Sequence, residues 1–339
     1  MSRSFGMTPS RRWLLQHALP GIGTAAGLAT SRRPARAAAA GRDTDTLRLT
    51  WGFGGLPLIA KERGAFAKAL AGDNIRVEWV GPFPNYAPSI QAVVGGSADF
   101  SFGGSTTPAL AAILGGSLLV FALFAEVAPR TTSIIAADSS GINSVADLVG
   151  KSVAVNRSGV AEFLLVAALE KYHVDRSKVK VVYLNPPDAA PAFGSGQVDA
   201  WAMWSPGVDI ARSQYKAHNI FVEGRDLDFQ IDFNSWLIRK EFSERNRDIV
   251  TAVNAAFTAE AAWANSQQAE TIAQQQGHYS DAIRDLFIAQ KRQYQIRRVD
   301  DQAFIAQLQW AADWLSARKV LPGQVHIKDY LAALYKEPA

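Results

Sequence analysis

The sequence predicts an α/β protein with two lobes, each built on a mainly parallel sheet that helices flank on both faces. Three observations favour this fold. Short β-rich runs alternate with helical stretches from residue 47 onward, the alternation restarts near residue 144, and the chain after residue 241 is almost entirely helical. Alternating strands and helices are typical of sheets covered by helices on both faces. A chain of 339 residues is also long enough for two domains of ordinary size.

In the first unit, β-branched and aromatic runs mark strands, and glycines mark the ends of helices. The helix expected at 106–114 ends at Gly115-Gly116, where left-handed backbone geometry costs little. The expected strands are 47–51, 75–80, 99–102, 118–124 and 131–137, and the other expected helices are 57–70 and 88–94.

The second unit opens with a helical turn that Ser144 caps. The strands expected after it are 151–155, 179–184, 199–203, 219–222 and 233–239, with a helix at 161–172. The helices expected in the last third are 247–265, 267–276, 280–290, 300–317 and 327–335. The chain is expected to cross between lobes near 128–137 and near 230–237, so the predicted lobes are 45–132 with 238–339, and 133–237.

Residues 1–40 have the pattern of an export signal. Arg11-Arg12 precede an uncharged stretch of about 13 residues, and a run of small residues ends at Ala40. The stretch is shorter than the roughly 20 residues that a stable membrane span needs. We therefore expect a cleaved signal peptide of twin-arginine type, with general secretion as the alternative route, and a protein that acts in the periplasm.

Composition excludes several classes of function. Without the six arginines of residues 1–40, 29 basic residues stand against 31 acidic ones, so we expect neither nucleic acid nor an anionic membrane as a partner. The absence of cysteine excludes disulfides, thiolate nucleophiles and cysteine-ligated metals. The histidines are far apart and lack metal-site spacing. We expect no metal and no cofactor.

Motifs typical of enzymes are also missing. No phosphate-binding loop of the G-x-x-x-x-G-K-[ST] type occurs, and Pro57 stands where a dinucleotide-binding turn that starts at Gly52 needs its third glycine. The turn at 103–107 does not match the G-x-S-x-G pattern of hydrolases. We therefore predict that the protein is not an enzyme.

Three small-residue turns lead from a strand into a helix, at 52–56, 103–108 and 156–159. Helix starts present unpaired N–H groups and the positive end of the helix dipole, and small residues let an anion approach them. In open α/β sheets such turns gather at the carboxyl ends of strands, where ligands bind. The turns therefore indicate an anion held between the lobes, although each could equally be only a cap.

Several tracts in a fixed order carry a resemblance to a known family. They are V-E-W at 77–79, G-S-A-D-F at 96–100, S-V-A-D-L-V-G-K at 144–151, L-L at 164–165, A-L-E-K at 168–171, and V-D-A-W at 198–201 with Trp204 and Pro206. The chain from about Leu47 to Leu334 thus resembles the periplasmic solute-binding proteins of ABC importers, in the aliphatic sulfonate, nitrate and taurine branch. The resemblance implies a type II periplasmic binding fold, with a ligand cleft between two lobes that close.

The resemblance also implies the ligand-binding positions. They are Phe53, Gly54, Ser105, Thr106, Arg157, Ser158, Gly159, Trp204, Ser205 and Asn234. Arg157 would give an oxyanion a charge-assisted bond, or else form a surface salt bridge. Trp204 would supply an apolar wall that Phe83 and Tyr86 extend, whereas Trp201 is expected in the core. Ser235 is a further candidate donor.

Three positions depart from the family pattern. Gly104, Ser205 and Gln91 stand where the family often has acidic residues. If they face the cleft, it repels anions less and lacks a partner for a ligand amine. The expected ligand is a small organic anion, an aliphatic sulfonate with an apolar tail, and nitrate, taurine or an aromatic acid are alternatives. The expected partner is an inner-membrane ABC permease, and the expected state is a monomer. A cysteine-independent enzyme on the same scaffold is the remaining alternative.

Overall fold

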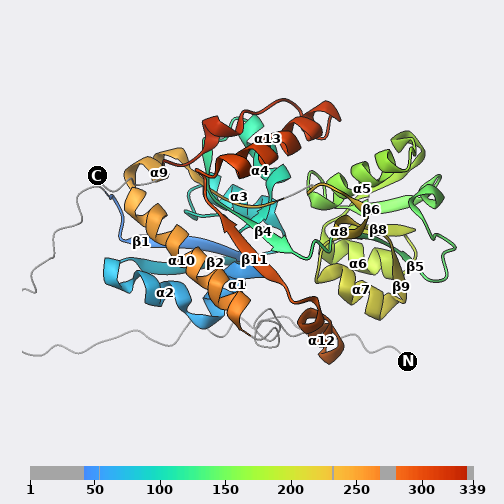
Figure 1. Ribbon diagram of the computed structural model, residues 1–339, viewed down its shortest axis with the longest axis horizontal. Helices are drawn as coiled ribbons and strands as arrows, with labels where there is room; N and C mark the ends of the chain where they lie inside the picture. Colours follow the sequence, from blue (N-terminus) through green and yellow to red (C-terminus); the bar gives the residue numbers. More distant parts are fainter. Residues whose placement is uncertain (1–41, 53, 231–232, 268–279, 334–339) are drawn as a thin grey trace, which may run out of the picture. The chain divides into compact units, whose positions relative to one another are not determined.

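The computed structural model describes residues 42–52, 54–230, 233–267 and 280–333, which belong to one compact unit. The predicted signal peptide lies outside the described residues, so its limits and export route stay predictions. The described elements form a five-stranded sheet and a second sheet made of a two-stranded and a four-stranded part, all flanked by helices, and the predicted α/β class is confirmed (Figure 1).

The first sheet contains strands from both ends of the described chain, and we call it with its helices the first lobe. Its strands β1 and β2 are parallel, whereas β10 runs antiparallel to β3 and β4, and β11 runs antiparallel to β4. Phe100 bridges β1 to β10 and joins these parts. The strands are β1 (Thr46–Gly52), β2 (Arg76–Phe83), β3 (Gly104–Ser105), β4 (Leu119–Ala128), β10 (Asn234–Arg239) and β11 (Gln293–Arg297).

The second sheet has the order β7-β6-β8-β5-β9, and we call it with its helices the second lobe. Strand β6 is parallel to β7 and β8, and β5 is antiparallel to β8 and β9. The strands are β5 (Ser133–Ala137), β6 (Ser152–Val155), β7 (Lys180–Tyr183), β8 (Ala200–Met203) and β9 (Ala217–Val222).

Both sheets are therefore mixed and not mainly parallel as expected. The chain leaves the first lobe along β4 and returns along its neighbour β10, and it enters the second lobe along β5 and leaves along its neighbour β9. Neighbouring strands that carry the chain out and back must run in opposite directions. Because β10 pairs in the first sheet from Asn234 onward, the return crossing ends a few residues before the predicted limit.

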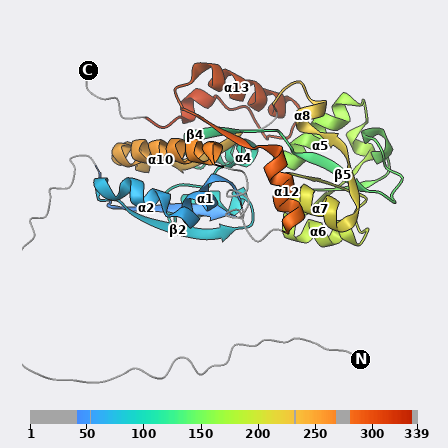
Figure 2. The same cartoon turned by 60° about the horizontal axis from the view of Figure 1, so that its bottom comes forward.

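Helices cover both faces of each sheet. In the first lobe, Trp236 and Ile238 pack with Phe257 of α10, whereas the intervening Leu237 belongs to the core on the opposite face. This alternation follows from the period of two in a strand. Figures 1 and 2 show α10 and α2 side by side. The helices are α1 (Gly55–Arg63), α2 (Ala65–Leu70), α3 (Tyr86–Val94), α4 (Thr106–Leu114), α5 (Val160–Lys171), α6 (Pro186–Gly194), α7 (Gly207–Tyr215), α8 (Glu223–Asp226), α9 (Lys240–Arg245), α10 (Arg247–Ser266), α12 (Asp281–Gln290) and α13 (Gln302–Ala317).

Several predicted elements need correction. The helix expected at 57–70 is two helices, because Gly64 takes a left-handed conformation with φ of 63° between them. The strand expected at 99–102 is reduced to the bridging residue Phe100. In the segment expected to be helical at 327–335, the described part holds only a 3₁₀ turn, Ile327–Tyr330. Strand β11 was not expected, and the helix predicted at 267–276 lies almost entirely outside the described residues.

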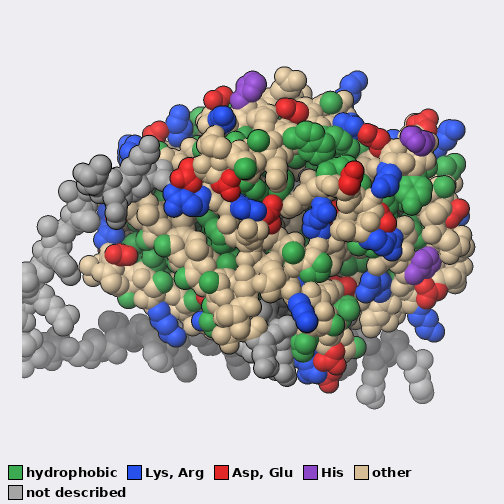
Figure 3. Space-filling view, in the orientation of Figure 1, with side chains coloured by type: hydrophobic (Ala, Val, Ile, Leu, Met, Phe, Trp, Pro, Cys, Tyr) green, Lys and Arg blue, Asp and Glu red, His purple; other side chains and the backbone are tan. Residues whose placement is uncertain are grey.

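The surface shown in Figure 3 carries acidic and basic side chains intermingled over both lobes. Among the described residues, no helix is both long and apolar enough to cross a bilayer.

A buried carboxylate ties the first sheet together where Phe100 replaces a strand. The Asp99 side chain, 3% exposed, accepts hydrogen bonds from the backbone and the guanidinium of Arg48, at 2.8 and 2.7 Å. Arg239 of β10 donates to the same carboxylate at 3.3 Å and to the carbonyl of Ala98 at 2.8 Å. Asp99 therefore connects β1, the bridging segment and β10.

We predict that Asp99→Asn lowers the free energy of unfolding by about 2–4 kcal/mol, because it removes a buried charge that faces two guanidinium groups. Urea denaturation followed by circular dichroism measures this change. Glu241→Gln is the control, since Glu241 forms an exposed pair with Arg245, and it should cost less than about 1 kcal/mol. Equal losses in the two variants would contradict the structural role of Asp99.

Candidate functional site

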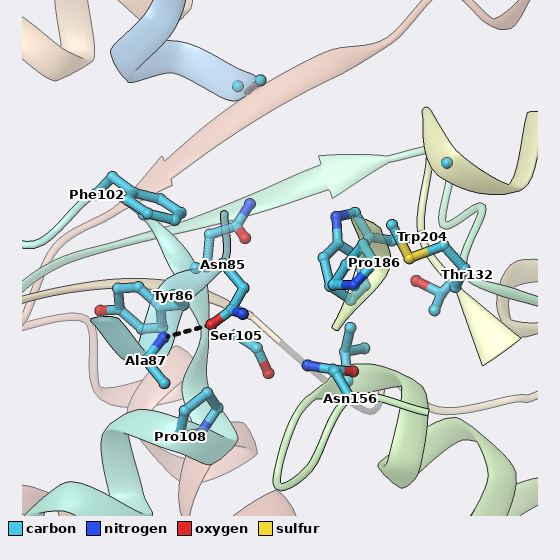
Figure 4. Close-up of a pocket in the computed structure, with 18 of the residues that line it drawn as sticks. Asn85, Tyr86, Ala87, Phe102, Ser105, Pro108, Thr132, Asn156, Pro186 and Trp204 are labelled. Atoms are coloured by element: carbon cyan, nitrogen blue, oxygen red, sulfur yellow. Dashed lines mark hydrogen bonds between the residues drawn. The ribbon is translucent and has the colours of Figure 1, made fainter. Parts of the chain in front are cut away.

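A cavity of about 980 Å³ is lined by both lobes, and we call it the cleft. The first lobe contributes the starts of α3 and α4, and the second contributes the turns before α5, α6 and α7. Figure 4 shows Tyr86, Phe102 and Ser105 on one side, with Trp204 and Asn156 opposite. A cavity of this size can enclose an organic ligand.

Most of the predicted site residues meet in this cavity. Thr106 and Gly159 lie behind the lining, and Phe53 lies outside the described residues. Ser235 and Trp201 are buried and are not part of the lining. The predicted residues that line the cleft are Gly54, Ser105, Arg157, Ser158, Trp204, Ser205 and Asn234, together with Phe83 and Tyr86 of the predicted wall.

The turn at 103–106 places a hydroxyl at the cleft. Ser105 lies opposite Asn234 in the β3–β10 pairing, so both side chains reach the same side of the sheet. The Ser105 Oγ is buried and has no hydrogen-bond partner among the residues that the structure describes. The neighbouring Thr106 hydroxyl donates instead to the carbonyl of Phe233 at 2.6 Å. Thr106 therefore fixes the turn, and Ser105 and Asn234 remain to face a ligand.

Gly104 is required by the position of Tyr86. A Cβ atom at residue 104 would lie 2.4 Å from the Tyr86 ring. The ring is held in place because its hydroxyl donates to the carbonyl of Ser235 at 2.5 Å. An acidic side chain at position 104 would need the space that Tyr86 occupies. Beside position 104 the cleft is therefore lined by the Tyr86 ring and not by an acidic side chain.

In the second lobe, the turn before α5 presents Arg157. Its guanidinium lies over the ring of Tyr183, 3.7 Å from the centroid, and no acidic partner lies within salt-bridge distance among the described residues. The surface salt bridge considered as its alternative role is therefore not observed. Glu162 holds the turn from behind, since it accepts the N–H of Ser158 at 2.7 Å and the hydroxyl of Tyr183 at 2.7 Å.

Two expectations about this turn change as a result. The Ser158 N–H already bonds to Glu162, so the donors that the turn offers a ligand are the side chains of Arg157 and Ser158. Gly159 is needed for packing, because a Cβ there would lie 1.7 Å from the Asn156 amide nitrogen. Burial first, and then its bond to Glu162, raises the pKa of the Tyr183 hydroxyl above its ordinary value. Tyr183 stays neutral under Arg157.

Trp204 forms the apolar wall of the second lobe, facing the first lobe (Figure 4). Ser205 beside it donates to the Asp209 carboxylate at 2.5 Å, and Asp209 lies 3.5 Å from Arg212. The carboxylate behind Ser205 is therefore already paired with a hydroxyl and a cation. The three residues that depart from the family pattern, Gly104, Ser205 and Gln91, all line the cleft.

Several lining residues were not found from the sequence. Arg130 and Glu223 lie at the crossing between lobes, 3.9 Å apart, and Arg130 also donates to the carbonyl of Phe229 at 2.7 Å. Arg292 and Tyr294 come from the unexpected strand β11 and its start. The alternation Gln-Tyr-Gln-Ile-Arg at 293–297 was the available signal for this strand.

One hydrogen bond spans the cleft directly. The Asn85 side-chain amide, at the start of α3, donates to the Asn185 side-chain oxygen, at the start of α6, over 3.0 Å. Asn85 also caps its own helix by accepting the N–H of Ala87 (Figure 4). The starts of two helices in different lobes are thus linked across the cavity.

Comparison with known proteins gives consistent matches. Residues 56–271 match the family described as NMT1/THI5 like. A protein of Escherichia coli (strain K12) named "Putative aliphatic sulfonates-binding protein" is 30% identical over 238 residues, which cover 70% of this chain and 72% of that protein.

Solved structures match over most of the chain. The periplasmic aliphatic sulphonate binding protein SsuA from Escherichia coli is 25% identical with a TM-score of 0.74, covering 88% of this chain and 96% of that one. The alkanesulfonate-binding protein SsuA from Xanthomonas axonopodis pv. citri, bound to MOPS, is 22% identical with a TM-score of 0.77, covering 85% and 98%. The two-lobed fold expected from the sequence is therefore confirmed.

We predict that Gly104→Ala destabilises the protein by about 1–3 kcal/mol, because the added methyl group displaces the Tyr86 ring. Gly54→Ala is the matched control, since a Cβ there meets nothing within 4 Å. Thermal unfolding of both variants measures the difference.

The destabilisation caused by Gly104→Ala should depend on the Tyr86 ring. In a Tyr86→Ala background, Gly104→Ala should cost less than it does in the wild-type chain, because the contact is gone. An unchanged cost would mean that Tyr86 is not the group that excludes a side chain at position 104.

Proposed function

Because the chain belongs to the NMT1/THI5-like family, we propose that it is the substrate-binding component of an ABC importer and that it captures an organic anion in the cleft. The resemblance drawn from the sequence is confirmed by the matches. The observation that carries the proposal concerns Arg157 and Ser105, which line the same cavity. Among the described residues, the Arg157 guanidinium has no acidic partner and the Ser105 hydroxyl has no hydrogen-bond partner.

The lining supports a ligand with an acidic head and an apolar body. Arg157 offers a charge-assisted bond, and Ser105 and Asn234 offer neutral donors. Tyr86, Phe102 and Trp204 supply aromatic surface, which contributes binding free energy by covering an apolar group. A sulfonate with an apolar tail uses both parts, whereas nitrate would use only the polar part.

The charges of the cleft favour an anion over a zwitterion. Glu223 is the acidic residue among the described lining residues, and Arg130 lies 3.9 Å from it. A ligand ammonium would therefore compete with Arg130 for this carboxylate. We expect taurine to bind more weakly than an alkanesulfonate of the same length.

Closure of the lobes would perform the function without a chemical step. Ser105 and Asn234 belong to the first lobe and Arg157 to the second, so a ligand that touches all three stabilises the closed arrangement. The matched relatives are named as binding proteins, which agrees with a protein that is not an enzyme. The bond between Asn85 and Asn185 would add to the closed state.

The place of action follows from the same proposal. We infer that residues 1–40 direct export by the twin-arginine route, that cleavage occurs near residues 37–40, and that the protein acts as a monomer in the periplasm. There it would deliver its ligand to an inner-membrane permease.

The ligand class is tested by thermal-shift and calorimetric titration with 1-pentanesulfonate, benzenesulfonate, benzoate, taurine and nitrate. We expect the two sulfonates to raise the melting temperature and to bind more tightly than taurine or nitrate. If none of these compounds shifts the melting temperature, the protein does not bind this class of anion.

The residues are tested by two variants. Arg157→Gln should weaken pentanesulfonate binding roughly 10- to 100-fold through loss of a charge-assisted bond, and Trp204→Ala should weaken it about tenfold through loss of the apolar wall. Arg176→Gln is the matched control, since Arg176 pairs with Glu162 behind the turn and does not line the cleft, and the affinity of this variant should stay within about twofold of the wild type. An equal loss in the control would contradict a direct role for Arg157.

A further inference from the structure

Arg292 is a second guanidinium in the cleft without an acidic partner. It lies between the end of α12 and the first residue of β11, far in sequence from the turns that the family resemblance identified. Its Nε atom is buried and has no hydrogen-bond partner, and no acidic group lies within salt-bridge distance of it among the described residues. The side chain as a whole is half-buried, and a buried N–H without a partner is costly, so the position of Nε needs an explanation.

Arg292 directly precedes β11 and lines the cavity beside this strand. Residues two apart in a strand share a face, and Tyr294, which is 5% exposed, lines the cleft with its partner Val127 in β4. The last pair of this register joins Gln293 to Ala128, and the next residue on each chain, Arg292 and Pro129, lines the cleft at the first crossing between lobes. Arg292 therefore belongs to the first-lobe side of the cleft, whereas Arg157 belongs to the second lobe.

Two of the cationic residues in the described lining have no acidic partner. The charged residues of the described lining are Arg130, Arg157, Arg292 and Glu223. Arg130 is paired with Glu223 and with the carbonyl of Phe229. A ligand with a single acidic group could compensate Arg157 or Arg292, and would leave the other without a partner.

The volume of the cavity also favours a ligand with two acidic groups. Its volume of about 980 Å³ is near the upper end of the roughly 300–1,000 Å³ that is usual for small-molecule sites. A short alkanesulfonate would fill little of it. A ligand long enough to contact both lobes can place an apolar body against Trp204 and Phe102 and still reach two separate polar ends.

We propose that Arg292 binds a second acidic group of the ligand, so that the preferred ligands are bulky organic dianions, with a sulfonate and a carboxylate or second sulfonate joined by an apolar or aromatic body. This inference rests on the proposed function, because it adds a second head group to the same anion site. Arg292 acts as a specificity-determining residue that separates dianions from monoanions.

The test compares benzenesulfonate with 3-sulfobenzoate and 4-sulfobenzoate by isothermal titration calorimetry on the purified protein. In the wild type, the better of the two sulfobenzoates should bind at least about tenfold more tightly than benzenesulfonate, because it gains a charge-assisted bond. In Arg292→Gln that advantage should fall below about threefold, because the second acidic group of the sulfobenzoate loses its partner. Arg292→Lys should keep part of the advantage, since it keeps the charge and loses the planar fork.

Lys291→Gln is the matched control, because Lys291 is the exposed neighbour and does not line the cleft. It removes the same charge and should retain the full advantage, and circular dichroism checks that each variant is folded. If benzenesulfonate binds and the carboxylate adds nothing, or if the advantage survives in Arg292→Gln, the role of Arg292 is wrong and the proposed function stands. If none of the three probes binds the wild type, this inference is wrong, and the proposed function fails as well when 1-pentanesulfonate also does not bind.

Discussion

The buried carboxylate of Asp99 is the constraint on which the first lobe depends. It accepts bonds from Arg48 of β1 and Arg239 of β10, and so holds the two strands at the distance that lets Phe100 bridge them. Two partly exposed guanidinium groups, Arg48 at 33% and Arg239 at 26%, compensate a charge that would otherwise be costly to bury. The chain leaves this anchor directly into the turn that carries Gly104 and Ser105. The first wall of the cleft is therefore placed by an ion pair outside it.

Two side chains, Tyr86 and Ser205, keep negative charge away from the ligand in the cleft. Tyr86 occupies the space that a side chain at position 104 would need, and Ser205 covers the carboxylate of Asp209. Neither position presents a free negative charge to a ligand. The remaining lining combines aromatic rings with guanidinium groups from both lobes, which suits an apolar body with acidic ends.

The lobes are joined by contacts away from the two chain crossings. Asn85 and Asn185 link the starts of α3 and α6, whereas α5 packs on α13 through Phe163 and Trp314, whose rings lie 4.8 Å apart. Arg318, just after α13, bonds to Glu170 of α5 and lowers the pKa of that carboxyl. A single side-chain hydrogen bond is modest in energy, whereas the packed rings exclude more apolar surface from water. Opening of the cleft would therefore break the Asn85–Asn185 bond at less cost than the α5–α13 contact.

The sequence by itself determined the alternation of strands and helices, the two-lobed class and most of the lining turns, because these depend on local periodicity and on small residues at helix starts. It identified Ser105, Arg157 and Trp204, which the structure places around one cavity. Only the tertiary structure decided that the sheets are mixed, that Thr106 and Gly159 serve packing, and that Arg292 joins the lining. The physical reason is separation along the chain. Which strand lies beside β4, and whether a hydroxyl or an N–H is already bonded, depend on partners that local sequence does not encode.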